Sequence, residues 1–170
     1  MTSTKPEPDR ERRHYMSALR KIQSVKEKSK RLKLIRILTS IKESWASEVL
    51  LDSLEDRNEE VRDIIIQELG KRKSLELELV CRKLSHPLWY VKSSAVKILG
   101  YQKNPTGLVH IEELLEEPNV EVRRAVAHAL GEIGGKQALA LLLKLTKDKN
   151  QFVRASVEAA IQQVSKLRIS

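Results

Sequence analysis

The sequence is poor in aromatic residues, glycine, proline and cysteine. Aromatic side chains make up 4% of the 170 residues, and there are six glycines, five prolines and one cysteine, Cys81. A single cysteine excludes an internal disulfide and suits a reducing compartment. No apolar run reaches the roughly 18 residues needed to span a bilayer, and the first fifteen residues lack the apolar core of a signal peptide. We therefore expect a cytoplasmic protein with no membrane partner.

Aliphatic and charged residues make up most of the chain. Hydrophobic residues account for 41% and charged residues for 32%, which places the chain outside the disordered class and favours an all-helical protein. The net charge of +9 is uneven, because residues 1–33 hold eleven Lys or Arg against four acids. The other 137 residues hold 21 against 19. Residues 1–33 are therefore strongly basic, whereas the rest of the chain is nearly neutral. An argument for nucleic-acid binding must rest on this basic N-terminal segment.

A pattern of 30 or 31 residues repeats along the chain. The segments NEEVRDIIIQELG, LWYVKSSAVKILG, NVEVRRAVAHALG and NQFVRASVEAAIQ align at Val61, Val91, Val122 and Val153. Apolar residues four and eight positions after each valine share one helical face. A second apolar segment follows each of the first three, and KRLKLIRILTSI fits the same pattern more loosely one period earlier. The helix boundaries carry candidate caps at Asn58, Ser74, Asn104, Asn119 and Asn150. This periodicity predicts stacked two-helix units.

The repeated pattern L-x-D-x-x-x-x-V-R-x-x-A-x-x-A-L-G-x-I-G resembles the HEAT-like repeats first described in phycobilisome lyases. EEPNVEVRRAVAHALGEIGG is the best match, and the resemblance covers about residues 28–167. It implies an all-α fold, a short right-handed α-solenoid of about four and a half two-helix HEAT-like repeats with an N-terminal capping helix. We divide the chain into a disordered tail (1–8), a basic capping helix (9–27) and the array (28–170), with units starting near 28, 58, 88, 119 and 150. Tyr15, Met16, Leu19 and Ile22 give the capping helix its apolar stripe.

The position after each valine is always basic, and the resemblance implies its role. The equivalent residues are Arg31, Arg62, Lys92, Arg123 and Arg154, and six positions before the last four stand Asp56, His86, Glu117 and Asp148. In HEAT-type arrays such acid and arginine pairs bridge neighbouring repeats at the turns. The resemblance therefore implies a structural ladder, in which the Lys92 unit is the exception because it carries His86. Arg124 has no periodic counterpart and is interpreted as solvated.

No catalytic or metal-binding arrangement is visible in the sequence. None of the four histidines has a second histidine or cysteine at ligand spacing on the same face, and there is no glycine-rich phosphate loop. Cys81 is interpreted as a core thiol and the two tryptophans as packing at repeat junctions. We expect no enzyme activity, no catalytic residue, no metal site and no cofactor.

Three functions remain open. The leading hypothesis is a non-enzymatic scaffold that binds an unidentified protein on the concave face, which the second helices line in such arrays. The candidate partner-binding residues are Glu48, Asp52, Glu76, Arg82, Lys83, Glu112, Glu113, Glu116 and Lys144. The first alternative is nucleic-acid binding through Arg10, Arg12, Arg13, Arg20, Lys21, Lys26 and Lys28. The second alternative, an accessory factor or subunit of a bilin-lyase-like system, rests on the resemblance alone. A monomer or weak dimer is expected.

Overall fold

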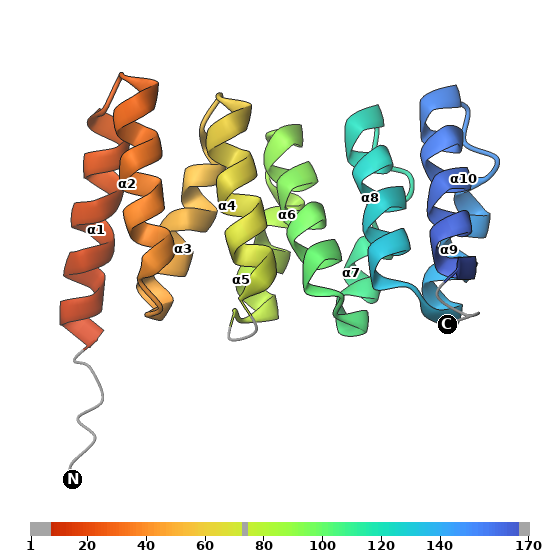
Figure 1. Cartoon of the computed structure of the whole chain (residues 1–170), viewed down its shortest axis with the longest axis horizontal. Helices are drawn as coiled ribbons and strands as arrows, with labels where there is room; N and C mark the ends of the chain where they lie inside the picture. The colour runs from red at the N-terminus through yellow and green to blue at the C-terminus, as the bar shows by residue number, and fades with distance from the viewer. Residues whose placement is uncertain (1–7, 73–74, 167–170) are drawn as a thin grey trace, which may run out of the picture. The chain divides into compact units, whose positions relative to one another are not determined.

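The computed structural model describes residues 8–72 and 75–166, and none of these residues forms a strand. The helices are α1 (Pro8–Ser24), α2 (Lys28–Ser40), α3 (Ser44–Asp52), α4 (Glu59–Lys71), α5 (Leu77–Cys81), α6 (Trp89–Gln102), α7 (Leu108–Glu112), α8 (Val120–Ile133), α9 (Gly135–Leu145) and α10 (Gln151–Lys166) (Figure 1). Three 3₁₀ turns accompany them, η1 (Ser53–Glu55), η2 (Arg82–Ser85) and η3 (Pro105–Gly107). The fold is an all-α solenoid of two-helix repeats. The predicted tail lies outside the described residues apart from Pro8, and so does the candidate cap Ser74.

The chain divides into two units, residues 1–65 and 66–170. In the first unit α1 packs on α3 and α2, and the buried side chains include Ile22, Ile35 and Leu50. The stripe predicted for α1 is only partly buried, because Met16 is 40% exposed whereas Ile22 is 5% exposed. One side of α1 therefore faces solvent even though its opposite side covers the first repeat.

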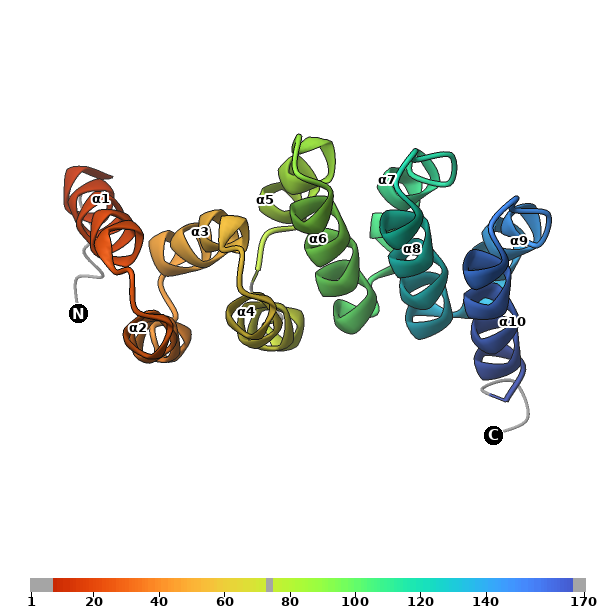
Figure 2. The ribbon, with the colours of Figure 1, turned by 90° about the horizontal axis from the view of Figure 1, so that it is seen from above.

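The second unit is built in two layers. Helices α6, α8 and α10 form the first layer, in which neighbours pack against each other, and α5, α7 and α9 form the second layer (Figure 2). Val91, Val122 and Val153 are completely buried in the first layer, as the repeat pattern predicts, and Val61 is equally buried in α4. Each of these valines starts a four-residue apolar spacing that keeps one side of its helix in the core.

Two glycines set the close approach of the first-layer helices. A Cβ atom on Gly100 would lie 2.8 Å from the Cα of Ala129, and one on Gly131 would lie 2.9 Å from the Cβ of Ala160. Both contacts are too short for real atoms, so only glycine allows α8 to lie against α6 and α10 against α8 at this distance. The glycine of the repeat pattern therefore serves helix packing.

The second-layer helices are shorter than the apolar segments that predicted them. Helix α5 spans five residues before η2, and α7 spans five residues after η3. The tighter 3₁₀ turn η2 leads the chain from α5 into α6, and η3 leads it from α6 into α7. No helix in the described ranges is long and apolar enough to cross a membrane.

Candidate protein-binding surface

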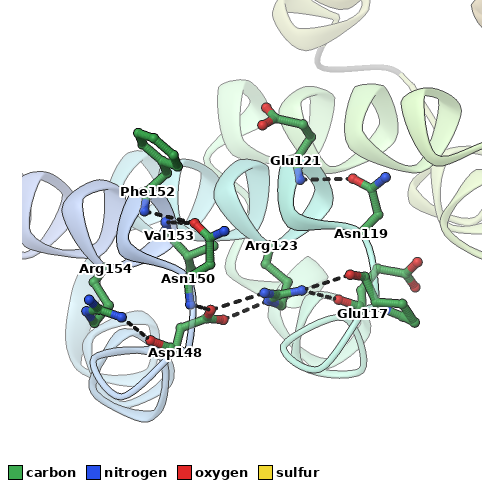
Figure 3. Close-up of polar contacts among 10 residues, drawn as sticks. Glu117, Asn119, Glu121, Arg123, Asp148, Asn150, Phe152, Val153 and Arg154 are labelled. Atoms are coloured by element: carbon green, nitrogen blue, oxygen red, sulfur yellow. Dashed lines mark hydrogen bonds and ion pairs between the residues drawn. The ribbon is translucent and has the colours of Figure 1, made fainter.

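Arg123 lies almost completely inside the turn between repeats (Figure 3). Its Nε and Nη2 atoms donate to the two carboxylate oxygens of Asp148 at 2.7 and 3.1 Å. Its Nη1 atom donates to the carbonyl oxygens of Glu117 and Pro118 at 2.7 and 3.1 Å. The side chains of Arg123 and Asp148 are only 4% and 6% exposed, so this bidentate pair is shielded from water. Arg123 joins its own turn to the next one, with donors on all three of its guanidinium nitrogens used inside the protein.

The same geometry recurs in the first unit. Arg31 donates to both carboxylate oxygens of Asp56 at 2.6 and 3.3 Å and to the carbonyl oxygens of Val25 and Lys26. In each pair the carboxylate comes 25 residues after the arginine, whereas one of the carbonyl groups comes six residues before it. The acid partner therefore lies in the turn that ends the arginine's unit and leads into the next one, which the sequence spacing alone did not specify.

The remaining ladder positions keep part of this arrangement. Arg62 and Arg154 each donate to the carbonyl oxygen six residues earlier, those of Asp56 and Asp148. Lys92 lies 2.9 Å from the Glu117 carboxylate, again 25 residues later, although its own turn carries a histidine in place of an acid. A lysine is a point charge without the arginine fork, so this pair lacks the second carboxylate contact.

The acids of the ladder also shape their own turns. Asp56 and Asp148 accept hydrogen bonds from the backbone N–H groups of Asn58 and Asn150, each at 2.8 Å. His86 takes the same role, because its Nδ1 atom accepts from the Leu88 N–H at 3.2 Å. The hydrogen bond from Arg123 and the one from the Asn150 backbone lower the pKa of Asp148, against the opposing effect of burial. The carboxylate is thus held in its charged form.

Asparagine side chains cap the helices that follow these turns. Asn119 accepts from the Glu121 N–H at 2.9 Å, and Asn150 accepts from the Phe152 N–H at 2.9 Å (Figure 3). Asn58 and Asn104 accept in the same way from Val61 and Thr106. These contacts satisfy N–H groups that a helix start leaves without partners.

Arg124 makes a more exposed contact than its neighbour Arg123, although its Nε atom is buried without a hydrogen-bond partner. Its Nη1 atom contacts the Glu121 carboxylate at 3.0 Å, in an ion pair whose side chains are 43% and 50% exposed. Such exposed pairs contribute little to stability. The first arginine is structural and the second belongs to the surface.

Two aliphatic side chains stand out on the second layer of the second unit. Val109 on α7 is 59% exposed and Leu143 on α9 is 56% exposed. The adjacent residues Leu108 and Leu142 are buried, so Val109 and Leu143 lie on the sides of their helices that face away from the core. We call this face the α7–α9 face. The sequence patterns did not single out either side chain.

Charged residues are exposed on the same layer of helices. Glu112 and Lys144 form an exposed pair at 2.6 Å that joins α7 to α9. Glu113 and Glu116 are exposed. The exposed side chains of Glu78 on α5 and Arg82 on η2 lie 3.6 Å apart. Glu76 is exposed just before α5, and Lys83 on η2 is half-buried. Most of the predicted partner-binding residues of this unit are therefore accessible on the second layer.

Cys81 is half-buried on α5, which corrects its interpretation as a core thiol. Burial, with smaller contributions from the negative charges of Glu78 and Glu113, raises its pKa to about 11. The thiolate is the reactive form, so this cysteine is poorly suited to nucleophilic chemistry. Within the described part of the chain no three or more His, Cys, Asp or Glu side chains group as metal ligands would.

The two predicted partner-binding residues of the first unit differ in accessibility. Glu48 is exposed, whereas Asp52 accepts a hydrogen bond from the Tyr15 hydroxyl and so helps to hold α1 on α3. This hydrogen bond is the main reason why the pKa of Tyr15 rises to about 12. Trp45 packs edge to face with His14 at 5.4 Å between ring centres, so it lies at the α1–α3 junction. Trp89, in the second unit, is 43% exposed, which corrects its interpretation as a junction residue.

The basic residues assigned to the nucleic-acid alternative all lie on the surface. Arg10, Arg12, Arg13, Arg20, Lys21, Lys26 and Lys28 are exposed. Lys28 forms an ion pair with Glu60 at 2.7 Å, and Arg31 is occupied by the turn contacts described above. Arg12, Arg13 and Arg20 line one hollow on the outer side of α1.

Comparison with known proteins agrees with this architecture. The family model for HEAT repeats matches residues 77–162. The complex of CpcE and CpcF of phycocyanin lyase from Nostoc sp. PCC7120 is similar with a TM-score of 0.60 and 23% identity, over 99% of this chain and 70% of that chain. An engineered protein is similar with a TM-score of 0.51 and 18% identity, over 89% of this chain and 79% of that chain. No curated protein matches the sequence.

The ladder of Arg123 and Asp148, the glycines between first-layer helices and the capped turns lie inside or beside the matched residues 77–162. The match covers half of the chain. The chain therefore belongs to the HEAT repeat family.

Proposed function

We propose that the protein is a non-catalytic scaffold that binds another protein on the α7–α9 face. The observation that carries this proposal is the exposure of Val109 and Leu143 on a layer of helices that also exposes charged side chains. Aliphatic anchors within a charged rim are the composition of a specific protein interface, where burial supplies affinity and the charges select the partner. The solenoid fold supports the same role, because stacked repeats present an extended surface for binding.

The ladder behind this face supports its use in binding. Asp148 lies in the turn after α9 and is bound to Arg123 on α8, and Glu117 lies in the turn after α7 and is bound to Lys92 on α6. These contacts fix the ends of the second-layer helices against the first layer. A fixed surface loses little conformational entropy when a partner binds.

A capture experiment tests the proposal. The tagged protein and its V109D/L143D variant are incubated with an extract of the source cell, and the proteins retained are identified by mass spectrometry. The variant lacks two aliphatic anchors and places charges in the interface. Its affinity for a purified partner should fall at least about tenfold, because each anchor contributes roughly 1.5–3 kcal/mol when buried. Calorimetry with that partner measures the loss.

The chain offers a matched control. Ile37 and Phe152 are 61% and 59% exposed, close to the values for Val109 and Leu143, and lie on α2 and α10 instead of the second layer. The I37D/F152D variant should bind the partner with the affinity of the wild-type protein. Equal loss in both variants would reject the α7–α9 face as the binding surface.

The same experiment examines the second alternative. The lyase complex similar to this chain shares its fold, and at 23% identity the similarity extends no further. A captured partner that carries a bilin, seen by its visible absorption, would favour an accessory role in a bilin-lyase-like system. A partner without a chromophore would favour the general scaffold.

A further inference from the structure

The outer side of α1 carries a basic hollow with a methionine in it. The hollow is lined by Arg12, Arg13, Met16, Ser17 and Arg20. Met16 is 40% exposed, and the three arginines are exposed as well. On its other side Met16 borders Glu11 and Glu48, so the cations lie mainly on one side of it. An exposed, flexible apolar side chain with cations on one side is suited to contact an apolar group that has acids beside it. We call this surface the α1 hollow.

The α7–α9 face has the complementary arrangement along α7 and the turns after it. Val109 is the exposed apolar residue, Glu113 follows it by four positions and Glu116 by seven. Both glutamates are exposed, and neither has an ion pair within the described part of the chain. Their charges are therefore available to an external cation. We call this row the α7 acidic row.

The spacings of the two surfaces match. Arg12 and Arg20 each lie four residues from Met16, one on either side, and Glu113 lies four residues from Val109. Four residues of helix rise about 6 Å, so an arginine and a glutamate meet when Met16 contacts Val109. Because an arginine lies both before and after Met16 along the helix, this pairing holds for either direction of α1 along α7.

We propose that the α1 hollow of one copy of the protein docks on the α7 acidic row of a second copy. The contact joins two different surfaces, so each copy can offer one of each and the association continues head to tail. The occupant is a second copy because this chain itself supplies the basic, methionine-containing helix that the acidic row fits. The proposal is independent of the partner proposed above, although such a partner and a second copy would compete for Val109.

The contact is small and therefore weak. It buries two partly exposed apolar side chains and a few surface charges, and the net charge of +9 opposes the approach of two copies. We expect self-association that depends on concentration, with no stable dimer when the protein is dilute.

Sedimentation velocity over a concentration series tests this with the full chain. The sedimentation coefficient of the wild-type protein should rise with concentration. The rise should be lost in R12E/R20E, which reverses the charge of the hollow, and in E113K/E116K, which reverses the charge of the row. All four positions are exposed, and circular dichroism checks that both variants remain helical.

Mixing the two variants gives the sharpest outcome. The acidic α1 of R12E/R20E now fits the basic row of E113K/E116K, and the wild-type surfaces that remain on each variant also fit each other. An equimolar mixture should therefore regain the rise that neither variant shows alone. A mixture that behaves as the sum of its two components would overturn the proposal.

A control separates this contact from a general charge effect. The variant E43K/E158K changes the net charge by the same amount as E113K/E116K, at two exposed glutamates on neither surface. It should associate like the wild-type protein. Loss of the rise in this control would assign the effect to net charge and overturn the proposal. The proposal would also be overturned if the sedimentation coefficient of the wild-type protein did not rise up to its solubility limit. The α7–α9 face would then be a binding surface for a different protein.

Discussion

At the scale of the residue, neighbouring arginines with the same chemistry have opposite roles. Arg123 is buried with its carboxylate partner and two carbonyl groups, whereas Arg124 shares an exposed contact with Glu121. A buried guanidinium without partners is costly, so the surrounding acceptors are required once the side chain is inside. The position in the repeat determines which of the two arginines is structural.

We predict that Arg123→Ala lowers the free energy of unfolding by about 3 kcal/mol, because Asp148 and the carbonyl groups lose their buried donor. Arg124→Ala should change it by less than about 0.5 kcal/mol, as expected for an exposed pair. Urea unfolding followed by circular dichroism measures both. Equal losses would show that burial of Arg123 does not set its contribution.

The pair of Arg123 and Asp148 makes the stability of the protein depend on pH in the acid range. The pKa of Asp148 is lowered from its ordinary value of 3.8, chiefly by the hydrogen bond from Arg123. A carboxyl group with a lowered pKa in the folded state stabilises the protein above its ordinary pKa and loses this contribution as the pH falls through the folded value.

We therefore predict that the stability difference between the wild-type protein and D148N is constant near neutral pH and shrinks below pH 3.8. Unfolding midpoints in urea over a pH series measure it. If the difference stayed the same throughout the acid range, the charge of Asp148 would contribute nothing to the pair.

At the scale of the element, the distance between first-layer helices is set by backbone contact. Gly100 faces Ala129 so closely that a single methyl group would overlap backbone atoms. An alanine inside a helix normally gains about 1 kcal/mol over glycine. Here overpacking costs roughly 1–3 kcal/mol, which outweighs that gain.

We predict that Gly100→Ala destabilises the protein by about 1 kcal/mol net, and that adding Ala129→Gly recovers part of the loss by removing one of the two clashing atoms. A double-mutant cycle in urea measures the coupling. Strict additivity of the two changes would mean that the contact does not limit the approach of α6 and α8.

Much of the arrangement of the helices could be predicted from the sequence. The valine spacing placed the cores of α4, α6, α8 and α10 correctly, since Val61, Val91, Val122 and Val153 are all buried. Periodicity succeeds here because each buried residue recurs at the same place in every repeat. The second-layer helices were less predictable, because 3₁₀ turns at η2 and η3 shorten α5 and α7 without changing the apolar pattern.

The candidate surface was less predictable than the core. A spacing of 31 residues does not show whether Arg123 pairs with the acid of its own turn or with Asp148 of the next turn. Each of these two turns carries an acid, so both pairings fit the sequence. Val109 and Leu143 are ordinary aliphatic residues in apolar segments, so hydrophobicity alone predicts burial for both. Their exposure follows from which side of each short helix faces the core, and that depends on packing.

At the scale of the whole molecule, the uneven charge is the main feature that the fold does not explain. Residues 1–33 hold eleven Lys or Arg against four acids, and the rest of the chain is nearly neutral. Part of this charge is used within the protein, since Arg31 is bound in the ladder and Lys28 pairs with Glu60. The arginines of the α1 hollow remain on the surface.

We predict that this charge does not give tight nucleic-acid binding. Affinity for phosphates falls by roughly 10³–10⁵ between 50 and 200 mM salt when six to ten contacts are made, and α1 presents fewer cations than that on one side. Tyr15 and His14 are the aromatic residues of α1, and the hydroxyl group of Tyr15 donates a hydrogen bond to Asp52. Tyr15 is therefore not placed to stack on a base.

Fluorescence anisotropy with duplex and single-stranded probes measures this for the wild-type protein and for R12Q/R13Q/R20Q/K21Q. We expect weak binding at low salt that disappears near about 150 mM, as counterion release predicts for a few surface cations. The four-residue variant should differ only at low salt. Submicromolar binding by the wild-type protein near physiological salt, lost in the variant, would make α1 a nucleic-acid site, because surface retention alone does not survive screening.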